Sequence, residues 1–383
     1  MADYELIETH ADLDALAQDL LGEKVISVDT EADSFYHYFD KTCLVQVGTT
    51  RGSWLIDPLE IGGRDSLAPL GDLFASPDVR VLFHAAEYDI FVLKRDYGFT
   101  FDNLFDTMVS SQLLGYRAVG LSALVEQHFD IKLPKDEQRS DWSRRPLTDK
   151  QLAYAASDVE YLIPLAEKLE RELHKKKRLD WALEEFDALT KREWPKRSFD
   201  KLGYLRIKGA RRLDPKSLSI LRELYLLRDQ RARETDRPPF KVLGNRTLIE
   251  IAEAKPRSLA ALAEIKGVSD LILRRMGREL MDAVRTGRKE EHGPIPKQTT
   301  PGRRRMDRRS EKRLNALKGW RRSQAEAIDL DPGVLCPNAT LETLALDPPA
   351  SMDELTQRTG LKNWFVQSFG AEVVDYLNGA HSD

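Results

Sequence analysis

Short apolar runs and amphipathic stretches alternate along the first 175 residues. Five runs of apolar residues predict buried strands, at residues 5–9, 25–29, 42–48, 53–56 and 79–83. Apolar residues recur at helical spacing at residues 13–21, 109–114, 121–129 and 151–173, and a further helix is predicted directly after the last strand. This order of elements predicts an α/β domain with a mixed sheet.

Helical patterns dominate from about residue 179 onward, and part of this region is repeated. Residues 210–286 and about 310–380 match without gaps at a constant offset of 93 residues. The matching positions are glycine, serine, arginine and apolar residues, and they pair Leu221 with Leu314, Leu224 with Leu317, Arg228 with Arg321, Ser258 with Ser351, Leu262 with Leu355, Gly267 with Gly360 and Gly277 with Gly370. We interpret this as a duplicated all-helical module, in which Asn245 and its counterpart Asn338 are expected to be helix N-caps.

A segment rich in proline, glycine and charge, RKEEHGPIPKQTTPGRRRMDRR, separates the two repeats. Its composition is typical of an exposed linker. The predicted division of the chain is therefore an α/β domain at 1–175, a helical connector at 176–209, a first helical module at 210–290, a linker at 291–309 and a second helical module at 310–383.

Charge is distributed unevenly along the chain. Residues 1–200 contain 24 lysines and arginines against 38 aspartates and glutamates, a net charge of −14. The remaining 183 residues contain 35 against 25, a net charge of +10. A basic half is typical of proteins that bind a polyanion such as nucleic acid, although ordinary variation of surface charge gives the same pattern.

The cysteine content and the hydropathy exclude several classes of protein. The two cysteines, Cys43 and Cys336, lie far apart and support neither a disulfide framework nor a zinc site. The first residues are acidic and lack the apolar stretch of a signal peptide, and no run approaches the ~20 apolar residues of a membrane span. We therefore expect a cytoplasmic protein without membrane contact.

Acidic residues stand at the ends of two predicted strands. In VISVDTEADSF, Asp29 and Glu31 are separated by one residue, so their side chains point to the same face of the strand, roughly 6–7 Å apart along the chain. Asp89 falls in the first turns of the helix that follows the strand at 79–83. Ligands gather outside the carboxyl ends of strands in open α/β sheets, so these carboxylates are candidates for a shared site.

A second pair of polar side chains is predicted on one face of a helix. Thr148 and Gln151 form a capping box, which starts a helix whose apolar stripe begins with Leu152. Tyr154 and Asp158 are four residues apart and flank this stripe. A phenol and a carboxylate are therefore presented together at the edge of the core.

Four carboxylates together, from Asp29, Glu31, Asp89 and Asp158, form a dense negative site that needs compensation. Mg²⁺ and Mn²⁺ prefer oxygen ligands, and two such ions about 3.5–4 Å apart can bind the attacking and leaving oxygens of a phosphodiester. Tyr154 would orient the attacking water, since a tyrosine pKa of about 10 makes it a poor base. Each residue also has an ordinary alternative, as a helix-start acid, a solvated helix acid or a half-buried tyrosine.

Three motifs, VDTEAD, HAAEYDIFVL and YAASDVEYL, carry a resemblance to a known family. In order, spacing and strand–helix context they resemble the DEDD exonuclease superfamily, and the tyrosine four residues before Asp158 marks the DEDDy subclass, in which Tyr replaces His. The two helical modules resemble tandem HRDC domains. An exonuclease domain of this subclass followed by two such modules resembles the ribonuclease D family over nearly the whole chain.

The resemblance implies an RNase H-like fold and 3′→5′ hydrolysis that releases 5′-mononucleotides with two divalent ions. It also implies trimming of the 3′ ends of tRNA precursors and other small structured RNAs. By the same resemblance, Asp29, Glu31, Asp89 and Asp158 are metal ligands and Tyr154 positions the water.

Three further residues carry weaker implications of the resemblance. Thr30 and His84 lie beside the ligands in the sequence and would touch the terminal nucleotide. The chain departs from the family pattern at Asp33, which adds a charge where aromatic or apolar residues are frequent.

Two basic clusters are candidates for RNA phosphate contacts. They consist of Arg303, Arg304, Arg305, Arg308 and Arg309 in the predicted linker, and of Arg206, Lys208, Arg211 and Arg212 before the first repeat. A solvated linker is the alternative for both clusters, and the helical modules could instead dock proteins.

Two other functions are compatible with the motifs. One is a DNA exonuclease of the same fold, since the choice of sugar depends on contacts with the 2′-hydroxyl. The other is a non-catalytic RNA-binding scaffold, which we would expect to lack one of the four acids or the tyrosine. We expect a monomeric enzyme that acts on RNA with an accessible 3′ end.

Overall fold

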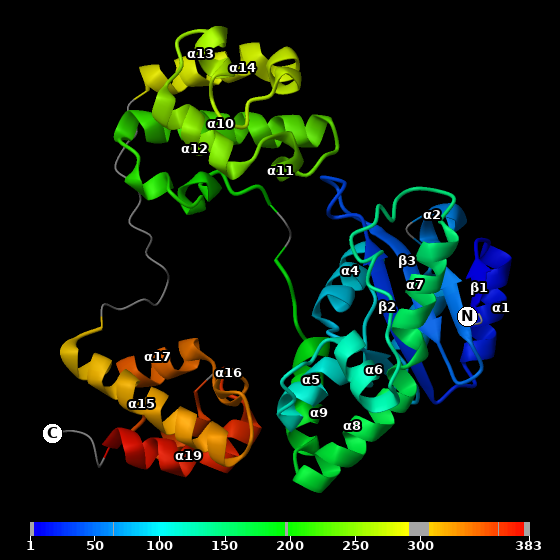
Figure 1. The fold of residues 1–383 in the computed structure, drawn as a ribbon. Coiled ribbons are helices and arrows are strands. Elements are labelled where there is room, and N and C mark those ends of the chain that lie inside the picture. The colour runs from blue at the N-terminus through cyan, green and yellow to red at the C-terminus, as the bar shows by residue number, and fades with distance from the viewer. Residues whose placement is uncertain (1–3, 64, 196–197, 291–305, 359, 379–383) are drawn as a thin grey trace. The chain divides into compact units, whose positions relative to one another are not determined.

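The computed structural model describes residues 4–63, 65–195, 198–290, 306–358 and 360–378. The chain forms two compact units, shown as a ribbon in Figure 1. Unit 1 combines Met1–Ala32, Thr42–Trp194 and Arg303–Asp383, and unit 2 combines Asp33–Lys41 with Pro195–Gly302. None of the helices in the described ranges is long and apolar enough to span a membrane.

A six-stranded mixed sheet is the framework of unit 1. Its strands are β1 (Tyr4–Ile7), β2 (Val25–Ala32), β3 (Thr42–Gly48), β4 (Ser53–Ile56), β5 (Arg80–Phe83) and β6 (Leu104–Asp106), in the order β1-β4-β3-β2-β5-β6. Strand β3 runs antiparallel to both of its neighbours, and the other pairs are parallel. The predicted α/β domain with a mixed sheet is therefore confirmed, although the three-residue strand β6 was not predicted.

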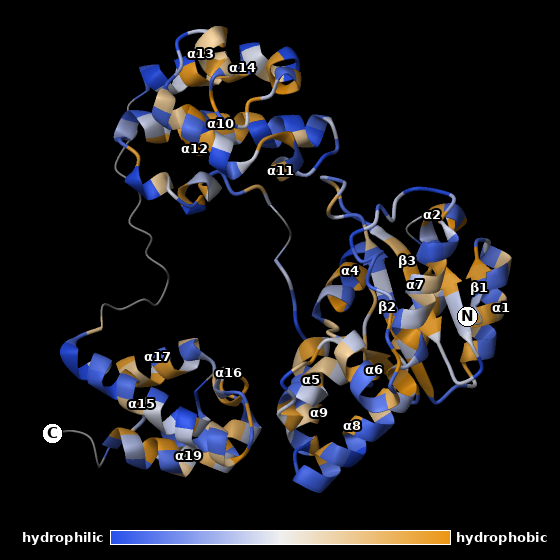
Figure 2. Cartoon of the chain, in the orientation of Figure 1, coloured by the Kyte–Doolittle hydropathy of each residue, from blue (hydrophilic) through white to orange (hydrophobic). Residues whose placement is uncertain are grey.

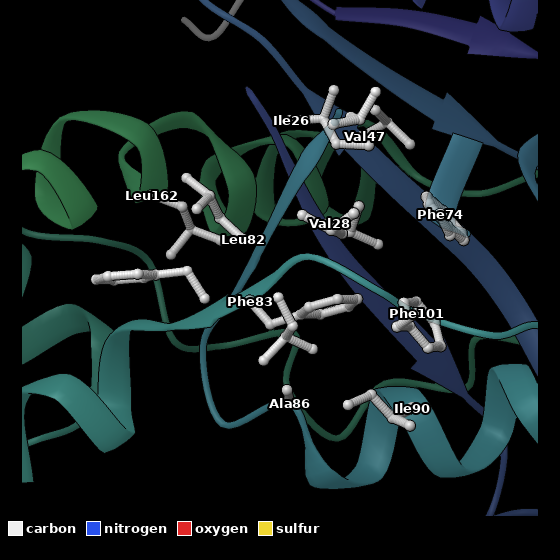
Figure 3. Close-up of a cluster of buried hydrophobic side chains, with 14 of the residues drawn as sticks. Ile26, Val28, Val47, Phe74, Leu82, Phe83, Ala86, Ile90, Phe101 and Leu162 are labelled. Carbon is white, nitrogen blue, oxygen red and sulfur yellow. The ribbon is translucent and has the colours of Figure 1, made fainter. Parts of the chain in front are cut away.

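Successive side chains of β2 point to opposite faces of the sheet, and only one of these faces is filled by the apolar cluster of Figure 3. Ile26 and Val28 are fully buried and pack into the apolar cluster of Figure 3, beside Phe83 at the end of β5. Residues between and beyond them, Ser27 and Asp29, point to the opposite face, because successive side chains of a strand alternate. One face of β2 thus holds the strand in the core and the other face is available for polar groups.

Nine helices pack around the sheet among the described residues of the exonuclease-like region. They are α1 (His10–Leu20), α2 (Pro58–Ile61), α3 (Ala68–Phe74), α4 (Glu87–Tyr97), α5 (Thr107–Leu114), α6 (Leu121–Phe129), α7 (Asp149–Glu160), α8 (Leu162–Lys176) and α9 (Leu179–Thr190). The long helix predicted at 151–173 is in fact two helices, since the chain turns at Tyr161 between α7 and α8. Figure 2 shows hydrophobic residues gathered on the strands and hydrophilic residues along α8.

Helix α7 lies very close to strands β2, β3 and β4. Ser27 Oγ donates a hydrogen bond to the carbonyl oxygen of Val159 at 2.9 Å. A Cβ atom at Gly48 would lie 2.5 Å from Ser27 Oγ and 3.2 Å from Val159 Cβ. Glycine at this position therefore allows the helix to sit directly on the sheet.

The second helical module belongs to unit 1 and packs against α9. Its helices are α15 (Arg308–Ala327), α16 (Pro332–Leu335), α17 (Asn338–Leu346), α18 (Met352–Thr356) and α19 (Asn363–Asn378). Trp181 of α9 stacks on Trp364 of α19, with ring centroids 4.4 Å apart. Glu184 accepts the backbone N–H groups of Asn363 and Trp364 at 2.6 and 2.8 Å, which satisfies the N-terminus of α19.

Unit 2 contains the first helical module and a short segment of the exonuclease-like sequence. Its helices are η1 (Gly203–Arg206), η2 (Ala210–Arg212), α10 (Pro215–Glu234), α11 (Pro239–Val242), α12 (Asn245–Ala254), α13 (Leu259–Ala263) and α14 (Asp270–Lys289). Asp236, just after α10, accepts the backbone N–H of Tyr38 at 3.0 Å and contacts His37 Nδ1 at 2.7 Å. The buried carboxylate of Asp33 is neutralised by an ion pair, in which the Lys41 ammonium donates a hydrogen bond to it at 2.7 Å.

The prediction that Asn245 and Asn338 are N-caps was wrong. Both are the first helical residue, after Gly244 and Pro337 as caps, and neither helix has a side-chain cap. Asn245 Oδ1 instead accepts a hydrogen bond from Arg228 Nη1 at 2.7 Å. A buried guanidinium from a neighbouring helix competes for the amide and holds it away from the helix end.

Candidate active site

Strand β2 presents Asp29 and Glu31 toward helix α7. It lies in the middle of the sheet, between β3 and β5, so its backbone is held on both sides. Asp29 and Glu31 share the face of Ser27, whose hydroxyl binds α7. The strand therefore fixes the backbone positions of Asp29 and Glu31 and the direction in which their side chains point.

Helix α7 brings Tyr154 and Asp158 to the same place. One carboxylate oxygen each of Asp29, Glu31 and Asp158 can be chosen so that all three lie within 4.8 Å of one another. The Tyr154 hydroxyl donates a hydrogen bond to the Asp158 carboxylate. The Tyr154 ring is 8% exposed and packs beside Trp142, with centroids 6.1 Å apart.

Asp89 reaches the site from the first turn of α4. Its carboxylate is buried and accepts a 2.6 Å hydrogen bond from the Thr30 hydroxyl. It stands outside the close group of three, but its charge adds to the effect of burial, which raises the pKa of Glu31 and of Asp158. The four acids proposed from the sequence thus lie together, three as one tight group and Asp89 beside it.

Removal of water and mutual repulsion destabilise the ionised carboxylates. Burial, followed by the charge of Asp158, raises the pKa of Asp29 well above its ordinary value. Burial likewise raises the pKa of Asp158 to about 7, although the hydrogen bond from Tyr154 opposes this rise. Without a compensating cation, the group holds protons at a pH where ordinary carboxylates are ionised.

Burial also raises the pKa of the Tyr154 hydroxyl, and the charges of Asp158, Glu31 and Asp29 add to the effect. The phenol is therefore neutral at physiological pH. It can donate one hydrogen bond and accept others, which suits orientation of a water molecule and not abstraction of its proton.

The donor set fits a hard divalent cation. All the converging atoms are carboxylate oxygens, the ligands that Mg²⁺ and Mn²⁺ prefer. The raised pKa values of Asp29 and Glu31 reflect burial first and the neighbouring carboxylate charges second, and both disfavour ionisation when no cation is bound. A cation would offset both effects, so the arrangement is one that could hold a divalent ion.

Thr30 and His84, expected near the terminal nucleotide, have other partners in the structure. The Thr30 hydroxyl donates a hydrogen bond to the Asp89 carboxylate. His84 Nδ1 lies 2.9 Å from Thr107 Oγ1, and this hydroxyl donates to the carbonyl oxygen of Phe83. Nδ1 must therefore carry the proton in that pair, and burial lowers the pKa of His84 to about 4, so that its ring is neutral.

Two residues that support the site were missed in the sequence. Asp106, at the end of β6, accepts the backbone N–H groups of Ala85 and Ala86 and so fixes the turn that leads into α4. Arg145 donates to the Asp57 carboxylate and to the carbonyl oxygen of Trp142, both at 2.7 Å, and thereby holds the segment beside Tyr154. An aspartate between a short apolar run and a helix was a usable signal for Asp106, whereas nothing local marks Arg145.

Comparison with known proteins places the chain in a family. Residues 4–174 match the model of a 3′-5′ exonuclease, and residues 217–284 and 310–377 each match the HRDC domain. The two HRDC matches are offset by the 93 residues of the internal repeat. The match supports the interpretation of a duplicated module.

Individual relatives cover about three quarters of the chain or more. Ribonuclease D of Pseudomonas paraeruginosa is 32% identical over 93% of this chain and 92% of its own length. The crystal structure of Escherichia coli RNase D, described as an exoribonuclease involved in structured RNA processing, is 26% identical, covers 98% of both chains and superposes with a TM-score of 0.69. The catalytic core of RRP6 from Trypanosoma brucei is 28% identical, covers 74% of this chain and 80% of its own, and has a TM-score of 0.68.

These matches agree with what the site shows by itself. The exonuclease match spans the sheet and all five residues of the acidic group with its tyrosine. The alignments with the full-length relatives extend over nearly all of the chain, beyond the exonuclease match and into the repeated helical modules. With its carboxylates gathered on β2, α4 and α7, the chain belongs to the ribonuclease D family and is a hydrolytic 3′-5′ exoribonuclease.

Proposed function

We propose that this enzyme trims the 3′ ends of tRNA precursors and other small structured RNAs and releases 5′-mononucleotides. Two divalent cations, Mg²⁺ or Mn²⁺, would be held by Asp29, Glu31, Asp89 and Asp158. The observation that carries this proposal is the approach of three carboxylate oxygens to within 4.8 Å beside a tyrosine hydroxyl. When bound, the cations stabilise the negative charge that develops on the phosphodiester oxygens.

The chain's own residues have distinct parts in this reaction. Tyr154, neutral and hydrogen-bonded to Asp158, would orient the attacking water through its hydroxyl oxygen. Its ring is fixed against Trp142, so the hydroxyl is placed without further ordering when substrate arrives. Thr30 acts on the site through Asp89, whose carboxylate it holds.

His84 is our candidate for contact with the terminal nucleotide. Its proton resides on Nδ1, so Nε2 can accept a hydrogen bond from a ribose hydroxyl. A contact of this kind would favour RNA over DNA if it reaches the 2′-hydroxyl. Thr30 lies next to the same site, but its hydroxyl is committed to Asp89, which leaves its backbone for any contact with the nucleotide.

Basic residues of the HRDC modules would contact RNA phosphates. At the start of the first module, a hollow is lined by Arg206, Lys208, Arg211 and Arg212. In the second module, Arg308, Arg309, Lys312 and Arg313 line another hollow, because α15 already begins at Arg308. Arg303, Arg304 and Arg305, the remainder of the predicted cluster, lie outside the described residues. Neutralising several phosphates would make binding fall as salt rises.

The domain boundaries and cellular setting are part of the same proposal. Residues 1–175 would be catalytic, 176–209 a connector, 210–290 and 310–383 the RNA-contacting modules, and 291–309 a linker. We propose a monomer in the cytoplasm. Cys43 and Cys336 are both free and buried, which agrees with a reducing compartment.

A labelled RNA tests the proposed activity. A 5′-labelled RNA with a single-stranded 3′ tail is incubated with Mg²⁺, with Mn²⁺ or with EDTA, and a DNA of the same sequence is run in parallel. We expect a ladder that shortens from the 3′ end of the RNA, is absent in EDTA and is lost in Asp29→Asn. Asp14→Asn, an exposed carboxylate of α1, is the matched control and should leave the ladder unchanged. Intact RNA under every metal condition would refute the proposal, and faster degradation of the DNA would reassign the substrate.

A further inference from the structure

A buried glutamine lies directly opposite Asp29 in the sheet. Gln46 of β3 pairs with Asp29 of β2 in the antiparallel register. Directly opposed residues of an antiparallel pair place their side chains on the same face, with Cβ atoms about 4.5–5.5 Å apart. The carboxamide of Gln46 therefore lies on the face that carries the acidic group, next to Asp29.

The environment of Gln46 is otherwise apolar. Its side chain is 0% exposed beneath α7, and its neighbours on the same face are Leu44 along β3 and Leu55 on β4. Both leucines belong to a buried apolar cluster that includes Tyr154 and Trp142. A carboxamide in this cluster is unexpected unless it serves a polar group.

Neither polar atom of Gln46 has a hydrogen-bond partner among the described residues. Both Nε2 and Oε1 are shielded from solvent, and none of the described groups lies within hydrogen-bonding distance. A buried polar group left unpaired costs about 1–3 kcal/mol, so an apolar residue of the same size would be preferred if only packing mattered. The amide is thus retained at a cost to stability.

Asp29, the residue opposite Gln46, is a hydrogen-bond acceptor with few donors. Among the described residues its carboxylate receives only a backbone N–H group, from Thr30. Carboxylates that bind a metal are usually hydrogen-bonded on the oxygen that faces away from the ion, and such supporting donors fix the ligand's orientation. Gln46 offers an unpaired donor opposite a ligand that lacks a side-chain donor.

We propose that Gln46 is a positioning residue of the metal centre, which donates a hydrogen bond from Nε2 to the Asp29 carboxylate, directly or through one water molecule, when the cation is bound. This inference rests on the proposed metal-dependent function. Gln46 touches neither substrate nor cation. It acts by holding Asp29 in the orientation that binds the ion.

The test measures Mn²⁺ binding to the full-length protein without RNA, by electron paramagnetic resonance of the free ion. Gln46→Met removes the carboxamide and keeps the volume, and Gln46→Leu is a second variant with the same purpose. We expect the dissociation constant for Mn²⁺ to rise 10–100-fold, the effect typical of lost supporting contacts. Leu44→Met, one position further along the same face of β3, is the matched control and should bind Mn²⁺ as the wild type does.

Thermal unfolding in EDTA separates a positioning role from a structural one. Replacing an unpaired buried amide by an apolar isostere should leave the melting temperature unchanged or raise it. A lowered melting temperature together with unchanged Mn²⁺ affinity would overturn the proposal, because the amide would then serve only the fold, for example through Trp142, whose Nε1 is also buried and lacks a partner among the described residues.

A double-mutant cycle identifies the partner. If Gln46 acts through Asp29, adding Gln46→Met to Asp29→Asn should not weaken Mn²⁺ binding further. Additive losses would refute the assignment to Asp29. A wild-type protein that binds no Mn²⁺ would overturn both this inference and the metal-dependent function, whereas wild-type binding that is unaltered in Gln46→Met overturns this inference alone.

Discussion

Asp158→Asn should stabilise the metal-free protein at alkaline pH, although it removes a residue of the candidate active site. Burial raises the pKa of Asp158 from 3.8 to about 7. The folded state therefore keeps the proton up to about pH 7, whereas the unfolded chain loses it near pH 4. Folding takes up a proton across this window, so the free energy of unfolding of the metal-free wild type falls as the pH rises from about 4 to about 7.

The magnitude follows from the size of the pKa shift. About three pKa units at about 1.4 kcal/mol each give about 4 kcal/mol of destabilisation above pH 7. Asparagine is neutral at every pH and escapes this cost, but it accepts the Tyr154 hydrogen bond less strongly, a loss of about 1 kcal/mol. The net gain of about 3 kcal/mol corresponds to about 6–12 °C in melting temperature for a cooperative unit of 150–250 residues.

Thermal unfolding in EDTA, followed by circular dichroism at pH 8 and pH 5, is the assay. We expect Asp158→Asn to melt above the wild type at pH 8, and the difference to vanish or change sign at pH 5, where Asp158 is already protonated. The lowered pKa of His84, about 4, affects both proteins equally. Asp149→Asn changes an exposed carboxylate of the same helix and is the control. A variant less stable than the wild type at pH 8, or a difference that does not depend on pH, would refute the reasoning.

Three other substitutions test separate contacts. Tyr154→Phe keeps the ring and removes the hydroxyl, so hydrolysis of RNA should slow by about 10²–10³-fold while Mn²⁺ affinity stays constant; equal rates would exclude a role in orienting water. Thr30→Val removes the donor to Asp89 and should weaken Mn²⁺ binding about 10-fold, with Thr30→Ser restoring it; failure of serine to restore binding would argue against the hydrogen bond. Trp181→Ala removes the stack on Trp364, which should cost about 1–3 kcal/mol and speed hydrogen exchange of the first amides of α19; unchanged exchange would show that the stack does not hold the module.

Local periodicity was sufficient to pair the polar residues within one strand and within one helix. Alternation in a strand places Asp29 and Glu31 on one face, and a spacing of four in a helix places Tyr154 and Asp158 together. Both rules depend only on neighbouring residues. That the strand and the helix meet at the same point was a hypothesis from the residues, which the family resemblance then supported.

Contacts between distant segments could not be predicted in the same way. Arg145 binds Asp57, 88 positions earlier, and Asp236 binds Tyr38, 198 positions away. No rule of spacing connects such pairs, because the fold alone brings them together. Gln46 was also overlooked, since a polar residue within an apolar strand has no local signal for the residue opposite it.

Predictions from local sequence preferences also failed where a residue or element distant in the sequence made a competing contact. Asn245 follows the sequence preference of an N-cap, yet Arg228 binds its amide and Gly244 takes the cap position. The long helix predicted across Tyr161 is broken there for a related reason. Its two halves share β2 but otherwise contact different strands, with α7 on β3 and β4 and α8 on β5.

The order of segments in unit 1 has a consequence during synthesis on the ribosome. The contacts of α9 with the second HRDC module join parts of the chain that are separated by Pro195–Gly302, about 100 residues of unit 2. At about 5–20 residues per second, the ribosome needs about 5–20 s to make this stretch. Trp181 and Glu184 have no Trp364 to contact until some time after this interval, and the first HRDC module has time to fold before the second is made. A nascent chain therefore completes its inserted module first and closes unit 1 last.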